Sequence, residues 1–184
     1  MILPRLPARA EDLARPRINR DSSPLLAMGI PWLSTMLASM VTFSPIVASA
    51  PVLPPFAFMV LLAWRMLRPG MLPVWIGLPL GAWDDLYSGQ PFGSAIVLWS
   101  VAMLAMEVID QRFLWRGFVQ DWLAASVLLT GYLFFSAVFA GVASGYPLPL
   151  SIGPQLLLSV VLFPVITQLV ALFDRVRLLP LRRL

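Results

Sequence analysis

Long apolar runs, separated by short polar or proline-containing connections, make up most of this chain. Six such runs cover residues 25–47, 52–67, 71–87, 93–109, 122–142 and 152–173. A helix of about 20 apolar residues is long enough to cross the roughly 30 Å hydrocarbon core of a bilayer. The pattern therefore predicts an all-α integral membrane protein with six transmembrane helices.

The segments that flank the runs predict the domain limits and the topology. Residues 1–24 form a polar tail, residues 25–173 the six-helix domain, and residues 174–184 a basic tail. The first run is longer than the 7–15 residues of a signal-peptide core, so an uncleaved helix is expected. Arginines occur in both tails and in the connections at 65–68 and 112–116, whereas the other three connections hold none. Because cytoplasmic loops carry the excess of basic residues, both termini are expected to be cytoplasmic.

Composition supports a membrane protein and removes most catalytic chemistry. The 184 residues are 59% hydrophobic and 12% charged, with no cysteine and no histidine. The chain therefore has no disulfide, no thiolate metal site and no histidine general base. The arginines lie at the ends of apolar runs and do not gather on one basic face, which argues against nucleic acid as a partner. We expect no catalytic residue, no metal site and no cofactor.

One stretch combines small residues with acids at regular spacing. In GLPLGAWDDLYSGQPFG a small or acidic residue recurs every fourth position: Gly77, Gly81, Asp85, Gly89 and Gly93. Four-residue spacing places the first three on one face of a helix, where glycine lets another helix backbone approach closely. The polar residues after Tyr87 are expected to end the helix in a tight turn. Gly141 and Gly145 repeat the small-residue spacing in the fifth run and are likewise assigned to helix packing.

The acids within the apolar runs allow two interpretations each. Asp85, with its neighbour Asp84, is expected near the extracytoplasmic face, where it either makes a buried contact to a partner helix or ligand, or satisfies amides of the following turn. Glu107 lies toward the cytoplasmic end of the fourth run, where an interfacial ion pair is favoured. Asp85 and Glu107 lie too far apart for a catalytic pair. Asp84 and Asp85 diverge by about 100° around a helix and do not converge on one substrate.

The spacing of Gly81, Asp85, Gly89 and Gly93 resembles the signature G-x-x-x-D-x-x-x-G-x-x-x-G of the MreD family, rod shape-determining membrane proteins. Length, number of predicted spans, short loops and basic C-terminal tail are also similar. The resemblance implies a fold similar to the six-helix substrate-binding subunits of ECF transporters. It also implies a location in the bacterial inner membrane.

The function that this resemblance implies is non-enzymatic. An MreD-like chain would be a scaffold of the cell-elongation complex that binds MreC. Through MreC it would support sidewall peptidoglycan synthesis by RodA and its class B penicillin-binding protein, together with MreB. The alternative is a small-molecule-binding membrane subunit of a transporter, which predicts a polar pocket with Asp84, Asp85 and Gln90 near its mouth. An intramembrane enzyme is disfavoured, because the acids lie at different depths.

Overall fold

The computed structural model describes residues 24–41, 53–112, 117–145 and 152–177. Their regular elements are all helical, with no strand among them. The α-helices are α2 (Pro24–Met40), α3 (Phe56–Leu67), α4 (Gly77–Tyr87), α5 (Ser94–Arg112), α6 (Phe118–Ser144) and α7 (Ile152–Arg177), and the short 3-10 helix η2 (Val74–Ile76) leads into α4. The prediction of an all-α chain is confirmed for these residues. Residues 1–23 of the expected N-terminal tail and 178–184 of the basic tail lie outside them.

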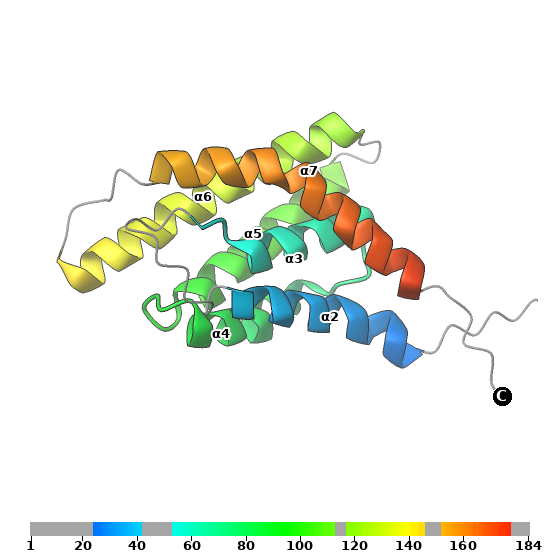
Figure 1. Ribbon diagram of the computed structural model, residues 1–184, viewed down its shortest axis with the longest axis horizontal. Coiled ribbons are helices and arrows are strands. Elements are labelled where there is room, and N and C mark those ends of the chain that lie inside the picture. The colour runs from blue at the N-terminus through cyan, green and yellow to red at the C-terminus, as the bar shows by residue number, and fades with distance from the viewer. Residues whose placement is uncertain (1–23, 42–52, 113–116, 146–151, 178–184) are drawn as a thin grey trace, which may run out of the picture.

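The helices form one bundle with α3 in its interior. Nine of the twelve residues of α3 are buried, and α2, α6 and α7 all pack against it. Figure 1 shows α3 between α7 on one side and α2 on the other. Aromatic side chains fill the space around it: Phe58 stacks on Tyr132 of α6 with ring centroids 4.3 Å apart. The Trp64 indole donates a hydrogen bond to the Ser34 hydroxyl of α2 at 2.9 Å.

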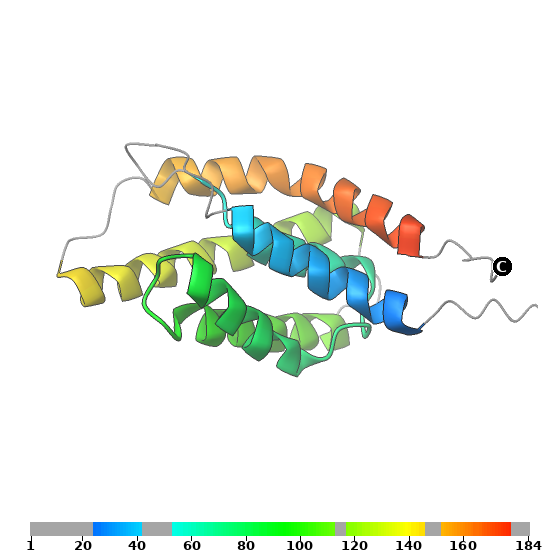
Figure 2. The same cartoon turned by 60° about the horizontal axis from the view of Figure 1, so that its bottom comes forward.

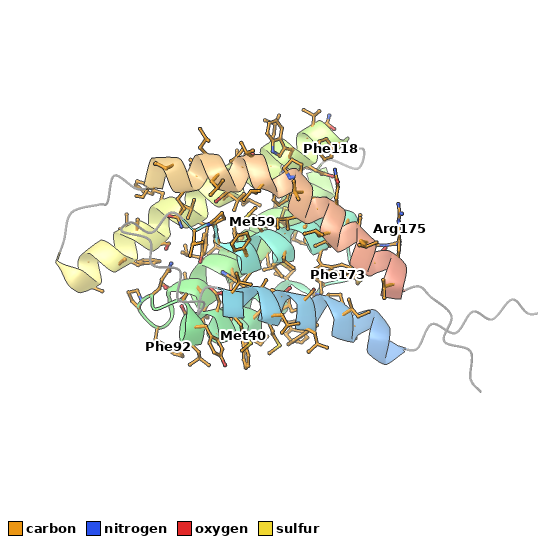
Figure 3. All side chains as sticks on the ribbon, in the orientation of Figure 1. Met40, Met59, Phe92, Phe118, Phe173 and Arg175 are labelled. Atoms are coloured by element: carbon orange, nitrogen blue, oxygen red, sulfur yellow. The ribbon has the colours of Figure 1, made fainter. Side chains whose placement is uncertain are left out.

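The two ends of the bundle differ in charge. Figures 1 and 2 show the start of α2 and the end of α7 at the same end. We call this the arginine end, because it also holds the turn after α3 and the end of α5, with the side chains of Arg65, Arg68, Arg112 and Arg175. The opposite end, here called the aspartate end, holds Asp84, Asp85 and the turn between α4 and α5. Figure 3 labels Arg175 at the arginine end and Phe92 at the aspartate end.

Three of the described helices are long and apolar enough to cross a membrane. These are α5, α6 and α7, whose candidate spans are Ser94–Arg112, Phe118–Ala143 and Ile152–Val176. The apolar helix α3 is shorter: its 12 residues extend about 18 Å at 1.5 Å per residue. It is nevertheless the most deeply buried helix, since its neighbours surround it. Six transmembrane helices were expected; the described residues form six α-helices, and three of these have the length and composition of a span.

Several helix ends differ from the predicted limits. The second run was expected to be helical from residue 52, but α3 begins at Phe56, after Pro54 and Pro55. Proline restricts the residue before it to extended conformations and lacks an N–H, so the helix starts only after the pair. The third run becomes helical only at Val74, after Pro73. The fourth and sixth runs continue past their predicted ends at 109 and 173, to Arg112 and Arg177. For the first run, residues 42–47 lie outside the described residues.

Candidate functional site

The carboxylate of Asp85 joins the last turn of α4 to the first turn of α5. One oxygen, Oδ2, accepts hydrogen bonds from the backbone N–H of Gly93 at 2.8 Å and of Ile96 at 3.3 Å. The other, Oδ1, accepts from the N–H of Ala95 at 2.9 Å and from the Ser94 hydroxyl at 3.3 Å. The first N–H groups of a helix have no partner within the helix, and a negative charge there is favoured by the helix dipole. Asp85 is therefore an N-terminal cap for α5 that is supplied by the preceding helix.

The turn between the two helices brings the α5 amides to Asp85. Helix α4 ends at Tyr87, as its sequence predicted, and two glycines follow with positive φ, 68° at Gly89 and 99° at Gly93. Residues with a Cβ rarely adopt this conformation, so glycine is required by the path of the turn. The N–H of Ser94 closes the turn on the carbonyl of Pro91 at 3.0 Å. A chain that reverses direction this tightly returns its amides to the carboxylate eight to eleven residues earlier.

Gly77 and Gly81 lie where the backbones of α4 and α5 touch. A Cβ at Gly81 would come within 2.8 Å of the carbonyl oxygen of Ala95 and the Cα of Ile96. At Gly77 it would lie 2.9 Å from backbone atoms of Trp99 and Ser100. Both distances are shorter than van der Waals contact, and the atoms concerned are backbone. The two glycines and Asp85 thus lie on one face of α4, and that face contacts α5.

Three further glycines of the predicted set, Gly89, Gly93 and Gly145, lie away from any close helix contact among the described residues. A Cβ at Gly89, Gly93 or Gly145 would meet no atom within 4 Å among the described residues. Gly145 ends α6 in the left-handed conformation, with φ 73°, and donates its N–H to the carbonyl of Gly141 at 2.8 Å. Left-handed glycine is a common helix end because it lacks the steric penalty of a side chain. Backbone conformation accounts for these three glycines, and close packing within the described chain does not.

Asp84 points to a different part of the molecule from Asp85. It is 5% exposed, and the Ser39 hydroxyl of α2 lies beside its carboxylate. It lines a cavity of about 360 Å³ at the aspartate end, between α3, α4, α6 and the start of α7. Gln90 also lines this cavity, whereas Asp85 does not. Sequence reasoning placed all three near one polar pocket; the structure places two of them there, because the Asp85 carboxylate is directed into α5.

Glu107 lies at the arginine end in an ion-pair cluster that sequence reasoning described only in part. Its carboxylate pairs with the guanidinium of Arg65, which also lies 2.9 Å from Asp110. The Arg65 side chain is 1% exposed, so these acids offset a buried positive charge. An interfacial ion pair was predicted for Glu107 at the cytoplasmic end of the fourth run, and its partner comes from α3. The available signal was that Arg65 follows Phe58 and Leu61 at helical spacing on a buried face.

A second ion pair at the same end joins α3 to α7. The guanidinium of Arg68 donates to Asp174 at 2.7 Å and 3.1 Å. Sequence reasoning had assigned Asp174 to the cytoplasmic tail, but the residue lies in the last two turns of α7 and is buried. Together the two pairs connect α3 to α5 and α7 at the arginine end.

The arrangement of acids shows what chemistry the described residues can support. Asp84 and Asp85 face different surroundings, and Glu107 lies at the other end of the bundle, so none of them forms a carboxylate pair of the kind that hydrolases use. No group of three or more potential metal ligands occurs among the described residues. The site is best described as a capped helical hairpin, α4–α5, beside a small cavity with mostly apolar walls and a few polar groups.

Comparison with known proteins identifies the family. No curated protein and no solved structure matches the chain, so the fold similarity to ECF transporter subunits stays a prediction. A family model does match: rod shape-determining protein MreD, over residues 23–176. The matched region contains almost all of the six described helices, including the whole α4–α5 hairpin and Asp85. The chain therefore belongs to the MreD family of rod shape-determining proteins.

Proposed function

We propose that this chain is a non-enzymatic inner-membrane scaffold of the cell-elongation complex. In this proposal it binds MreC, and through MreC it supports the RodA–class B penicillin-binding protein synthase and MreB in sidewall peptidoglycan synthesis. The observation that carries the proposal is the MreD family match over residues 23–176. That family is defined by its role in determining the rod shape of the cell. A protein that determines cell shape by holding a complex together needs binding surfaces and a stable fold.

The geometry of the α4–α5 hairpin supports a scaffold. Its one intramembrane acid that follows the family spacing, Asp85, is fully engaged by amides and a hydroxyl of the same chain. Such a carboxylate stabilises structure and is not available to act as a general acid or base. Outward-facing apolar side chains recur along α5 at Val97, Val101, Leu104 and Val108, each more than half exposed. This outer face of the hairpin is where we place contacts with lipid or a partner helix.

The orientation of the chain in the membrane follows from the same proposal. The described arginine side chains all lie at one end of the bundle, and the start of α2 and the end of α7 lie at that end too (Figure 1). Under the positive-inside rule this end faces the cytoplasm. Both termini would then be cytoplasmic, and the cavity beside Asp84 would face the extracytoplasmic side.

The proposal is tested by affinity purification of the tagged chain from its native membrane in a mild detergent, followed by mass spectrometry. Wild-type protein is expected to recover MreC with RodA and the transpeptidase. Asp85→Ala and Gly81→Leu are expected to lose MreC and cell shape at equal membrane abundance, because both disrupt the α4–α5 contact. Gly131→Leu is the matched control, since a Cβ at Gly131 meets no atom within 4 Å. Normal shape and full MreC recovery in both hairpin variants would refute the proposal.

A second candidate function, a small-molecule-binding subunit of a transporter, is favoured by one observation. The cavity beside Asp84 has a volume within the range of ligand sites and combines apolar walls with a few polar groups. The same purification distinguishes the two candidates. Recovery of ATPase subunits with an energy-coupling membrane protein, in place of MreC, would support transport.

A further inference from the structure

The cavity at the aspartate end has the features of a ligand site that the scaffold role does not require. Its volume is about 360 Å³, at the lower end of the range for small-molecule pockets. Apolar side chains of α3 and α6 form most of its wall, among them Phe56, Phe58 and Leu133. Polar side chains of three helices, α4, α6 and α7, and of the turn after α4 line it: Asp84, Ser88, Gln90, Tyr132, Ser136 and Gln155.

The charge of the cavity is unbalanced. Asp84 is only 5% exposed, and the group from α2 that lies beside its carboxylate is the uncharged Ser39 hydroxyl. None of the described residues that line the cavity is an arginine, and the described arginine side chains lie at the opposite end of the bundle. A carboxylate buried in apolar surroundings is costly unless a positive charge accompanies it. The cavity therefore favours an occupant that is a cation.

The aromatic wall favours an organic cation over a metal ion. Phe58 and Tyr132, both lining residues, are stacked with an interplanar angle of 16°. Aromatic faces attract ammonium and guanidinium groups as well as apolar carbon. A metal ion would need several oxygen ligands around it, whereas Asp84 is the one carboxylate among the described lining residues. Gln155 is already held by a hydrogen bond from its Nε2 to the carbonyl of Leu53 at 2.7 Å, which fixes its amide at the cavity edge.

We propose that this cavity binds a small organic cation, with an ammonium or guanidinium group at Asp84 and an apolar body against Phe58 and Leu133. The inference goes beyond the scaffold role and deepens the second candidate function, because it names the chemical class of ligand that the cavity beside Asp84 would hold. Two sources can supply this chemistry, a free amine or the ammonium headgroup of phosphatidylethanolamine. Both place the same group at the same carboxylate.

The test uses the purified full chain in nanodiscs of phosphatidylglycerol, which carries no amine. Binding of phenethylamine and of agmatine is measured by isothermal titration calorimetry, with 2-phenylethanol as the uncharged counterpart of phenethylamine. At least one of the two cations is expected to bind saturably and the alcohol is not. Asp84→Asn is expected to weaken cation binding about tenfold or more, because it removes the charged partner. Asp121→Asn, at the start of α6 and away from the cavity, is the matched control and should bind as wild type.

A second variant keeps the test valid if Asp84→Asn does not fold. Ala137→Phe, on the cavity wall, is expected to fill the space and abolish binding while leaving Asp84 in place. Nanodiscs with added phosphatidylethanolamine separate the two sources: competition with the cations identifies the headgroup, and unchanged affinity identifies a free amine. The proposal is overturned if neither cation binds, if the alcohol binds equally well, or if both Asp84→Asn and Ala137→Phe bind as wild type. Because no partner protein is present, the outcome is independent of the purification experiment above.

Discussion

Asp84 and Asp85 are neighbours in the sequence whose side chains have different surroundings. Successive residues on a helix point about 100° apart, so α5 receives one carboxylate and the cavity the other. Asp85 accepts four hydrogen bonds from residues 93–96, whereas Asp84 lies beside the Ser39 hydroxyl and lines the cavity. Asp85 is thus the structural acid of the pair, and Asp84 is the acid that a ligand can reach.

Replacement of Asp85 by alanine is expected to lower the free energy of unfolding by about 3 kcal/mol. Three backbone N–H groups lose a charged acceptor, and a buried donor without a partner costs roughly 1–3 kcal/mol. Asp85→Asn keeps one carbonyl oxygen and is expected to lose about half as much. Unfolding by denaturant in detergent micelles, followed by tryptophan fluorescence, measures both. Asp84→Ala serves as the comparison, and a loss as large as that of Asp85→Ala would contradict the assignment of the cap to Asp85.

At the scale of elements, α4 and α5 form the most closely packed pair of helices in the bundle. The small-residue face at Gly77 and Gly81 brings the backbones together, and Asp85 caps the neighbour one turn farther along. The spacing in the sequence contains this information, because residues four apart must share a helical face. It did not reveal which helix was contacted, and the tight turn at Gly89 and Gly93 answers that question by returning the chain directly.

Gly81→Ala is expected to destabilise the protein by about 2 kcal/mol, the usual cost of forcing extra volume into a packed contact. The added methyl group would lie 2.8 Å from backbone atoms of Ala95 and Ile96, which cannot rotate away. Gly131→Ala in α6 is the matched control. Nothing lies within 4 Å of its Cβ position, so the better helix propensity of alanine is expected to leave stability unchanged or raise it by up to about 1 kcal/mol. Equal effects in the same unfolding assay would show that helix propensity, and not the α4–α5 contact, decides the outcome.

The helices were predictable from the sequence, whereas their ends and cross-chain contacts were less so. The apolar runs predict each described α-helix. They also predict that α5 and α7 end just before the first charged residue after each run, Asp110 and Asp174. Asp110 and Asp174 stay helical because Arg65 and Arg68 of α3 pair with them. Such pairing depends on which helices become neighbours, and that is a property of the whole bundle. The cavity likewise could not be predicted from the sequence, since its polar side chains come from three separate helices and a turn.

At the scale of the whole molecule, charge divides the bundle into two unlike ends. The described arginine side chains lie at the arginine end. There Arg65 and Arg68 also connect α3 to α5 and α7 through ion pairs. The aspartate end has no described arginine, and its two acids are turned inward, to α5 and to the cavity. An asymmetry of this kind orients a membrane protein, because basic residues resist transfer across the bilayer.

The orientation can be tested with single cysteines, because the natural chain contains none. Gln111→Cys places a thiol on an exposed position at the arginine end, and Phe92→Cys replaces a side chain that is 72% exposed in the turn at the aspartate end. With the arginine end in the cytoplasm, a membrane-impermeant maleimide added to intact spheroplasts should label Cys at 92 and leave Cys at 111 unmodified. After detergent permeabilisation both should react, which controls for accessibility, and the unsubstituted chain should not react at all.

The reverse labelling pattern would place both termini and the arginine end outside the cell. The cavity beside Asp84, at the opposite end of the bundle, would then face the cytoplasm. A cation supplied from outside the cell could then no longer reach the cavity directly, so this labelling also decides from which compartment the proposed ligand must come.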